Sequence, residues 1–343
     1  MARVLVVGGG LAAALVESEC TRRGIEAVVW AGQAPSASQV AAGMFNPVSF
    51  QRVLPVWRAE DHMAAAREVY GAFERRLGCA FVHSTPVLKV FASAEYARVW
   101  AERMEQRHEV AGWIAPGTWR EVPAGVQAPW GVGWVPEAGW VNVPKLVQKW
   151  EAELRATGRF KEGTWSRAAG VPKGFDSVFD CRGVGAREDL AACGLDLRPN
   201  HGEVLTLAGA RWPEGACLNT VSWLLPVGAG QCRLGSTYRW DIADERIHAD
   251  TVGQLVEKVA ASWRGVHQAG VVRHEAGVRP TSPDRRPWIG EVGPGHWVCN
   301  GLGTRGVLVG PWTAARLLDA WQFPAFELPG EVNVRRFRTF NPN

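Results

Sequence analysis

The 343-residue sequence has no long hydrophobic run and no excess of one charge sign. No apolar stretch approaches the roughly 18 residues of a membrane-spanning helix, and the short one at the N-terminus has no cleavage motif behind it. The 38 basic and 34 acidic residues leave a net charge of +4, which gives no evidence for a nucleic-acid or membrane partner. We therefore expect a soluble, intracellular protein of enzyme size, with one large domain or two ordinary ones.

Paired cysteines are also missing from the sequence. The seven cysteines are odd in number and widely spaced, they include no C-x-x-C pair, and they stand at positions 20, 79, 181, 193, 217, 232 and 299. This spacing argues against a disulfide framework or a zinc site and indicates reduced thiols in a cytoplasm. His83, His201 and His274 have no spacing typical of a metal site or a catalytic triad. We expect no metal and interpret these histidines as structural.

The first informative pattern is RVLVVGGGLAAALVESECTRRG, near the N-terminus. Four consecutive aliphatic residues, Val4–Val7, are typical of a strand buried on both faces. Gly8, Gly10 and Ala13 then occupy the three positions of a G-x-G-x-x-G/A turn, whose bare backbone can approach a pyrophosphate. A helix from Leu11 to about Arg23 would point its N-terminal amides at that phosphate. This order favours dinucleotide binding over a glycine-rich turn in some other α/β protein.

One part of the dinucleotide fingerprint is absent. An Asp or Glu is expected about 20 residues further on, at the end of the second strand, where it hydrogen-bonds the ribose hydroxyls. The second strand is predicted over Ile25–Trp30, the expected position falls near Ala31, and the surrounding WAGQAP holds no carboxylate. Gln33 could still hydrogen-bond a ribose hydroxyl, but without the charge assistance of an acid. No Arg stands in this stretch to indicate NADP instead.

The rest of the chain alternates helical and extended patterns. Helices are predicted over Trp57–Leu77, Ala94–Arg107, Val143–Thr157, Thr251–Trp263 and Pro311–Trp321. Apolar strands are predicted at Val87–Phe91, Ser177–Cys181 and Trp297–Asn300, and a separate antiparallel sheet at Val204–Leu207, Ser222–Val227 and Cys232–Thr237. Glycine loops near both ends and in the middle indicate one nucleotide-binding domain assembled from separated segments and interrupted by a second domain.

The C-terminal third resembles a known family. AGVRPTSPDRRPWIGEV (276–292) and NGLGTRGVLVGPWTAARLL (300–318) resemble the closing signature of the D-amino-acid-oxidase superfamily of FAD-dependent amine oxidoreductases. The resemblance extends through VLVVGGGLAAAL, AAGMFNP (41–47), GWVNVPKLV (139–147), FDCRGVGAR (179–187), WLLP (223–226) and RLGSTY (233–238). Within the superfamily the chain is most similar to the FAD domain of the bifunctional enzyme that modifies tRNA wobble uridines, and next to glycine and sarcosine oxidases.

The resemblance implies an α/β fold with a doubly wound, Rossmann-like FAD-binding domain and an antiparallel-sheet substrate domain. We assign residues 1–80, 141–200 and 275–343 to the first domain, and residues 81–140 and 201–274 to the second. The resemblance also implies FAD as the cofactor. The residues implied to hold it are Gly8, Gly10, Leu11, Ala13, Gln33, Gly43, Met44, Gly183, Gly301, Gly303, Thr304 and Gly306.

The activity implied is oxidation of the C–N bond of an amino acid or an N-substituted glycine, with hydride passing to the flavin and water hydrolysing the imine. Arg279, in G-V-R-P, matches the family's carboxylate-binding arginine, whose planar fork binds a carboxylate by two hydrogen bonds. Without the resemblance, an Arg before Pro is most often a solvated loop residue. Arg305 aligns with a basic residue that sarcosine-type members place beside the flavin, and Arg52 lies in the segment where they place another. Either could instead pair with a surface carboxylate.

Two aromatic residues complete the candidate site. Trp223 stands where amino-acid oxidases often have a Tyr that closes the pocket, so we expect a different pocket shape. Tyr238 could supply a pocket hydroxyl or simply pack in the sheet.

Two other functions stay open. One is oxidation of a modified tRNA nucleoside, for which Arg335, Arg336 and Arg338 form the dense basic cluster of the sequence. That cluster is also typical of a solvated tail, and we do not expect a nucleic-acid partner. The other is a flavin-binding scaffold or subunit without turnover. The electron acceptor and the exact substrate are not determined by the sequence.

Overall fold

The glycine turn near the N-terminus joins the strand and helix predicted for it. β1 (Arg3–Val7) is buried from Val4 onward, α1 (Leu11–Arg22) follows the turn, and β2 (Glu26–Ala31) pairs with β1 in parallel. The computed structural model describes residues 2–32, 36–106, 109–117, 122–210, 215–240 and 242–337. The predicted residues Gln33 and Arg338 lie outside these described ranges.

β1 lies inside a six-stranded sheet of order β11-β2-β1-β12-β20-β19. Its other strands are β11 (Phe160–Glu162), β12 (Ser177–Asp180), β19 (Trp288–Gly293) and β20 (His296–Asn300). Neighbouring strands pair in parallel except at the edge, where β19 and β20 are antiparallel. One core cluster joins this sheet to α1, α3 (Ala59–Leu77), α5 (Val143–Ala156) and α8 (Gly306–Gln322). The predicted α/β fold class is confirmed.

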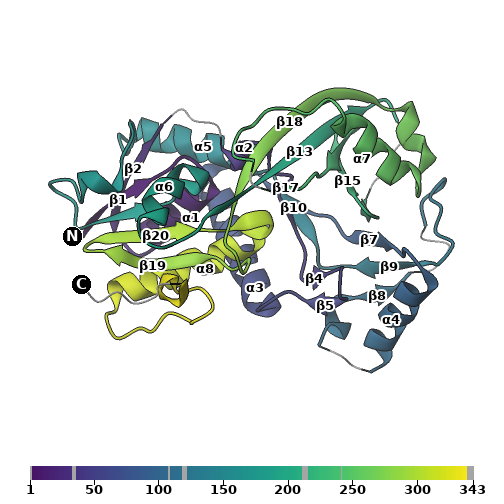
Figure 1. The fold of residues 1–343 in the computed structure, drawn as a ribbon, viewed down its shortest axis with the longest axis horizontal. Coiled ribbons are helices and arrows are strands. Elements are labelled where there is room, and N and C mark those ends of the chain that lie inside the picture. The colour runs from purple at the N-terminus through teal and green to yellow at the C-terminus, as the bar shows by residue number, and fades with distance from the viewer. Residues whose placement is uncertain are drawn as a thin grey trace.

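A second sheet of nine strands is largely antiparallel, with the order β17-β13-β16-β15-β14-β7-β9-β8 and β18 paired to β13. Only β14 and β7 pair in parallel among these described strands. The strands not yet placed are β7 (Val87–Val90), β8 (Ala115–Pro116), β9 (Val132–Val135), β13 (Arg198–Ala208), β14 (Cys217–Asn219), β15 (Trp223–Gly228), β16 (Gln231–Gly235), β17 (Arg239–Trp240) and β18 (Gly270–Thr281). The helices α4 (Ala94–Glu105) and α7 (Thr251–Ala260) lie on this side of the molecule (Figure 1).

The remaining helices and strands are short. They are α2 (Ala37–Val40), β3 (Met44–Phe45), β4 (Val48–Ser49), β5 (Leu54–Pro55), β6 (Val82–Ser84), β10 (Gly139–Val141) and α6 (Arg187–Ala191). The long strands β13 and β18 pair from Arg198 with Thr281 to Ala208 with Gly270, and Figure 1 shows them running from the β20 side of the molecule to the α7 side. They cross the boundaries predicted at 200 and 275, and the division into two domains stays a prediction.

The last long helix begins earlier than its sequence indicates. α8 starts at Gly306, five positions before the predicted Pro311, which therefore lies inside it. Pro311 has no N–H to donate to the carbonyl four residues back, that of Val307. The buried hydroxyl of Tyr70, on α3, donates to that carbonyl oxygen at 2.8 Å instead. No helix in the described part of the chain has the length and apolar character needed to cross a membrane.

Candidate cofactor and substrate site

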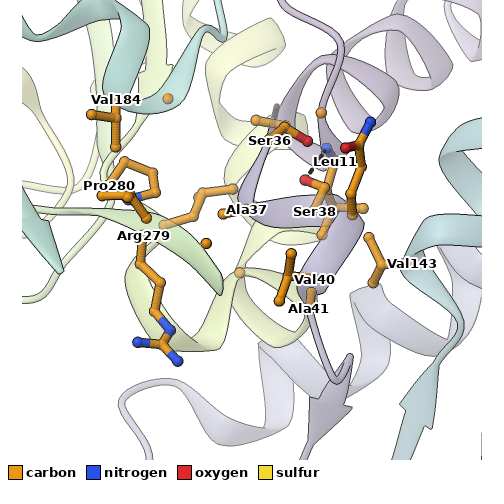
Figure 2. A pocket seen from close by; sticks show the side chains of 18 of the residues that line it. Leu11, Ser36, Ala37, Ser38, Val40, Ala41, Val143, Val184, Arg279 and Pro280 are labelled. Atoms are coloured by element: carbon orange, nitrogen blue, oxygen red, sulfur yellow. Dashed lines mark hydrogen bonds between the residues drawn. The ribbon is translucent and has the colours of Figure 1, made fainter. Parts of the chain in front are cut away.

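A cavity of about 1050 Å³ lies at the carboxyl ends of β1, β2 and β12 and continues beneath β13, β15 and β18. Open parallel sheets bind their ligands at this edge, outside the carboxyl ends of the strands. The volume is at the upper end of the usual range for ligand pockets, about 300–1,000 Å³. Figure 2 shows Leu11, Ser36 and Ser38 on one wall and Val184, Arg279 and Pro280 on the other. The cavity thus joins the glycine turn to the predicted substrate residues.

Gly8 and Gly10 keep the turn free of side chains. Gly8 has φ +130°, and a Cβ there would lie 2.6 Å from the carbonyl oxygen of Cys181. A Cβ on Gly10 would lie 3.0 Å from Ser38 Oγ. Ala13, the third position of the turn, is fully buried in the core and does not line the cavity. This placement fits the role of that position, which is to let the helix pack closely on the strand.

Two serines that sequence reasoning missed contact the same turn. Ser38 Oγ accepts a hydrogen bond of 2.9 Å from the backbone N–H of Leu11, at the start of α1. Ser36 Oγ is buried and has no hydrogen-bond partner among the described residues, and both serines line the cavity. A buried hydroxyl beside the positive end of a helix dipole favours an anionic or polar ligand. The only signal in the sequence was the run of small residues after β2.

The other predicted cofactor residues surround the same cavity with three exceptions. Those that line it are Gly8, Gly10, Leu11, Gly43, Met44, Gly183, Gly303, Thr304 and Gly306. Gly43 has φ +73°, and a Cβ there would overlap the carbonyl oxygen of Val141, so no other residue fits this turn. Ala13 and Gly301 lie buried outside the lining, and Gln33 falls outside the described residues.

Arg279, on β18, directs its guanidinium into the cavity, and its hydrogen-bond partners are neutral. Nη1 donates to Asn200 Oδ1 at 2.9 Å and to the Thr237 carbonyl oxygen at 3.3 Å, and Nη2 donates to Ser236 Oγ at 3.0 Å. No carboxylate among the described residues forms an ion pair with it. Burial lowers the pKa of Arg279 from its ordinary value. Because a buried charge is costly without a counter-charge, this position favours an anionic ligand.

Gly202 and Tyr238 hold the Arg279 guanidinium in place. Gly202 pairs with Gly277 across β13 and β18, and a side chain there would overlap the guanidinium. The ring of Tyr238 faces the guanidinium carbon at 4.9 Å, in a cation–π contact. The structure therefore places Tyr238 in the cavity wall, where the sequence left its role open between a pocket residue and sheet packing.

Arg305 lies at the start of α8 and lines the same cavity. Its Nη1 is 3.5 Å from the Asn46 carbonyl oxygen, burial lowers its pKa, and no carboxylate among the described residues pairs with it. Trp223, on β15, also lines the cavity and packs on Gly235, where a Cβ would lie 2.6 Å from its ring. Arg52 is exposed on the turn between β4 and β5 and does not line the cavity. The structure brings four of the five predicted substrate residues together and leaves Arg52 outside.

A buried lysine that sequence reasoning missed supports the substrate end of the cavity. Lys89 Nζ, on β7, donates to Asn219 Oδ1 and to the Thr220 carbonyl oxygen, each at 2.9 Å. Burial lowers the pKa of Lys89 to about 8. Because an ammonium group can only donate, Asn219 must accept through Oδ1, which leaves its amide N–H groups for the cavity that it lines. No local sequence signal marks Lys89, because its partners lie 130 residues away.

Glu203, on β13, forms hydrogen bonds that hold the segment following β17 in place. This fully buried carboxylate accepts hydrogen bonds from His248 N and Nδ1, Thr251 Oγ1 and His274 Nε2, at 2.8–3.0 Å. The ligand atoms of His201, Glu203 and His248 lie within 4.8 Å of one another, yet each Glu203 oxygen already accepts two hydrogen bonds. We interpret the cluster as an anchor for the segment 242–250, which contributes three residues to the cavity wall.

The chain matches known proteins along most of its length. The family described as FAD dependent oxidoreductase matches residues 3–320. The tRNA 5-methylaminomethyl-2-thiouridine biosynthesis bifunctional protein of Paracidovorax citrulli is 26% identical over 97% of this chain and 59% of its own length. Glycine oxidase of Pseudomonas putida is 28% identical over 92% of this chain and 93% of its own. The chain thus spans about three fifths of the length of the bifunctional relatives and nearly all of the oxidase.

Solved structures share the fold. Glycine oxidase from Geobacillus kaustophilus superimposes with a TM-score of 0.78 at 22% identity and covers 97% of this chain and 98% of its own. Iminodiacetate oxidase from Chelativorans sp. BNC1 has a TM-score of 0.77 at 20% identity, with 96% and 98% covered.

The cavity fits the FAD on which this family depends. Its glycine turn exposes bare backbone at the start of α1, and the segment Gly303–Gly306 brings a second helix start to the cavity. Ser36 has a buried hydroxyl with no hydrogen-bond partner in the described part of the chain. These are the groups that a long, polar and doubly phosphorylated molecule requires of a protein.

Proposed function

The chain belongs to the family of FAD-dependent oxidoreductases, and from this premise we propose that it oxidises the C–N bond of an amino acid or an N-substituted glycine. The observation that carries the proposal is Arg279, a cavity guanidinium whose partners among the described residues are all neutral. In this reaction the substrate loses a hydride from carbon and a proton from nitrogen, and water then hydrolyses the imine. When bound, FAD supplies the two-electron acceptor.

Arg279 anchors the substrate carboxylate in this proposal. Its Nη1 and Nη2 donate hydrogen bonds to Asn200, Ser236 and Thr237. These bonds keep the planar guanidinium in one orientation when the substrate enters. A carboxylate held by two hydrogen bonds fixes the direction of the carbon next to it. Fixing that carbon against its reaction partner is a large part of what a protein contributes to such a reaction.

Arg305, Tyr238 and Trp223 would shape the space beyond the carboxylate. Arg305 adds a second positive charge to the cavity, and the Tyr238 ring faces Arg279. Positive charge near the substrate favours the neutral amine over the ammonium, because like charges repel, and only the neutral amine can give up the hydride readily. Trp223 limits the size of the group that the nitrogen can carry.

The cofactor would be held by other residues that line the same cavity. The turn Gly8–Leu11, with Ser36 and Ser38, would bind the pyrophosphate through backbone amides and hydroxyls. Gly43, Met44 and the segment Gly303–Gly306 would lie against the flavin ring. Gly183 would lie on the adenosine side, close to Pro280.

The same cavity could serve a second substrate class, a modified tRNA nucleoside. The bifunctional tRNA biosynthesis relatives favour it, and an aminomethyl side chain also presents a C–N bond. Against it, Arg336 of the predicted basic cluster is already paired with Asp284 at 2.9 Å, and Arg338 lies outside the described residues. A small amine or amino acid is therefore the substrate that we favour.

We also propose that the protein is cytoplasmic. All seven cysteines are free thiols, and five of them are buried. Free thiols persist in a reducing compartment.

Anaerobic reduction of the bound flavin tests the proposal. FAD-loaded protein is mixed without oxygen with glycine and N-methylglycine, and in parallel with methylamine and dimethylamine, their counterparts without the carboxylate. We expect the flavin absorbance to bleach with the first pair and to persist with the second. Bleaching by an aminomethyl-modified nucleoside alone would favour the second substrate class. A flavin that none of these amines reduces would identify a binding scaffold.

A further inference from the structure

Asn219, on β14, lines the same cavity as the proposed carboxylate anchor Arg279. We propose that the Asn219 amide selects substrates that carry a second carboxylate, placed either on the nitrogen substituent or on the side chain of the amino acid. This inference rests on the proposed function, because it takes Arg279 as the group that binds the first carboxylate.

Lys89 fixes which way the Asn219 amide faces. β7 and β14 are parallel neighbours, and Lys89 pairs directly with Asn219. The ammonium Nζ donates to Asn219 Oδ1 at 2.9 Å, and because an ammonium group can only donate, the amide oxygen is the atom turned toward Lys89. No hydrogen bond in the described part of the chain uses Asn219 Nδ2. The NH2 group is therefore the part of this amide that a ligand in the cavity can contact.

Strand register places Trp223 between Asn219 and Arg279. Asn219 pairs with Trp223 of β15, and Trp223 pairs in turn with Gly235 of β16, so the three residues share one face of the sheet. The Trp223 ring covers Gly235, where a Cβ would lie 2.6 Å from it. Ser236, the next residue, accepts a hydrogen bond of 3.0 Å from Arg279 Nη2. A substrate bound to Arg279 can therefore extend across the Trp223 ring toward Asn219.

The separation of the two donors suits a short dicarboxylate. β14 and β16 are two strand spacings apart, which is about 10 Å. A hydrogen bond of about 2.9 Å at each end leaves roughly 4 Å between the two accepting oxygen atoms. Two carboxylates joined through one amine span such a distance, and the Trp223 ring offers the part between them an apolar surface.

The charges near this wall favour an anionic substituent. Lys89 is 7% exposed, and its Nζ lies 5.5 Å from the centre of the Phe50 ring, which lines the cavity. Within the described ranges no carboxylate pairs with Lys89, Arg279 or Arg305. The carboxylates that line the cavity lie on α5, β11 and the segment after β17, not on the strands around Asn219. A buried charge is costly without a counter-charge, so a second carboxylate near Lys89 is favourable.

The first test measures binding without turnover, by titration calorimetry on the FAD-loaded protein. Diglycolate has two carboxylates joined through an ether oxygen and no C–N bond, and methoxyacetate is its counterpart with one carboxylate. Diglycolate should bind the wild type at least roughly tenfold more tightly, the gain expected for one hydrogen bond to a charged group. Equal binding of the two compounds would overturn the proposal.

Asn219→Asp is the sharpest variant for this titration. It keeps an oxygen for Lys89 and replaces the NH2 group by a second oxygen, so the advantage of diglycolate should disappear. Asn333→Asp is the matched control, because Asn333 Oδ1 also accepts one hydrogen bond, from Arg335 N at 2.9 Å, and Asn333 lies outside the cavity. The advantage should persist in this control. Its persistence in Asn219→Asp would overturn the assignment.

The second test compares substrates by anaerobic flavin reduction. N-(carboxymethyl)glycine is paired with N-isobutylglycine, an apolar isostere, and aspartate is paired with leucine in both enantiomers. In one of these pairs kcat/KM should be at least roughly tenfold higher for the dicarboxylate, and that pair shows where the second carboxylate lies. Asn219→Asp and Asn219→Leu should abolish this ratio, mainly through KM, because the contact forms before the chemical step. Lys89→Met lets the amide turn over and should lower the ratio by less.

The ratio separates recognition of the second carboxylate from a structural role of Asn219. A variant that only loosened the fold would lower kcat/KM for both members of a pair, and an unchanged ratio would overturn the role of Asn219. A wild type that oxidises N-methylglycine but prefers no dicarboxylate in either test would overturn this inference and leave the proposed function standing. Tight binding of diglycolate without flavin reduction by any amine would do the reverse.

Discussion

Replacing Arg279 by Ala removes the proposed carboxylate anchor and should leave the cofactor bound. No carboxylate among the described residues pairs with the Arg279 guanidinium, which donates hydrogen bonds to three neutral oxygen atoms. Its positive charge is therefore available to the substrate carboxylate. Loss of a charge-assisted contact costs about 1.5–3 kcal/mol, and the contact here is bidentate. At the upper end of that range, kcat/KM for flavin reduction should fall roughly 100-fold.

The assay is stopped-flow flavin reduction over a range of substrate concentrations, with Arg279→Ala and Arg279→Lys beside the wild type. Lys should recover only part of the loss, because a point charge cannot reproduce the planar fork. Arg52→Ala is the matched control, since it removes an exposed arginine outside the cavity and should change nothing. An amine without a carboxylate should reduce the flavin slowly, and its rate should be the same in the wild type and in Arg279→Ala. Unchanged kinetics in Arg279→Ala would refute the assignment of Arg279 as the group that binds the substrate carboxylate, and Arg305 would become the candidate.

Two further predictions concern the buried polar groups around the cavity. Lys89→Met should reveal the low pKa of this lysine. Between about pH 8 and 10.5 the unfolded wild-type chain binds the lysine proton and the folded chain does not. The free energy of unfolding of the wild type relative to the variant, measured by urea denaturation, should therefore rise over that pH window. Parallel curves would contradict it. In Glu203, burial opposes the charge, but hydrogen bonds from His248, Thr251 and His274 outweigh it and hold the pKa of Glu203 below its ordinary value. Glu203→Gln should therefore destabilise the protein at pH 7, and this difference should shrink as pH falls below about 4.5; a difference that grows in acid would refute the anchor.

The sequence predicted the parts of the site that depend on local pattern. We could predict three contiguous features from local pattern alone: the strand at Val4–Val7, the glycine turn and the helix after it. In each of them the residue types have a single physical explanation. Met44, Gly183 and Gly303 came from a resemblance, and the structure places all three at the cavity.

The parts that could not be predicted depend on pairing between distant segments. α8 begins before Pro311 because Tyr70, 237 residues from Val307, satisfies the carbonyl that the proline leaves open. Lys89 gains its role from Asn219, which lies 130 residues away in the sequence. Arg52 lay in a suitable segment, but a turn directs it to solvent.

The central claim is that the substrate loses a hydride from the carbon next to its nitrogen. Its most direct test is the rate of anaerobic flavin reduction by the best amino-acid substrate, measured with that carbon carrying hydrogen and again with it carrying deuterium. The account predicts a several-fold slower reduction with deuterium. Equal rates under conditions where the chemical step limits reduction, or no reduction by any amine that carries a carboxylate, would contradict it.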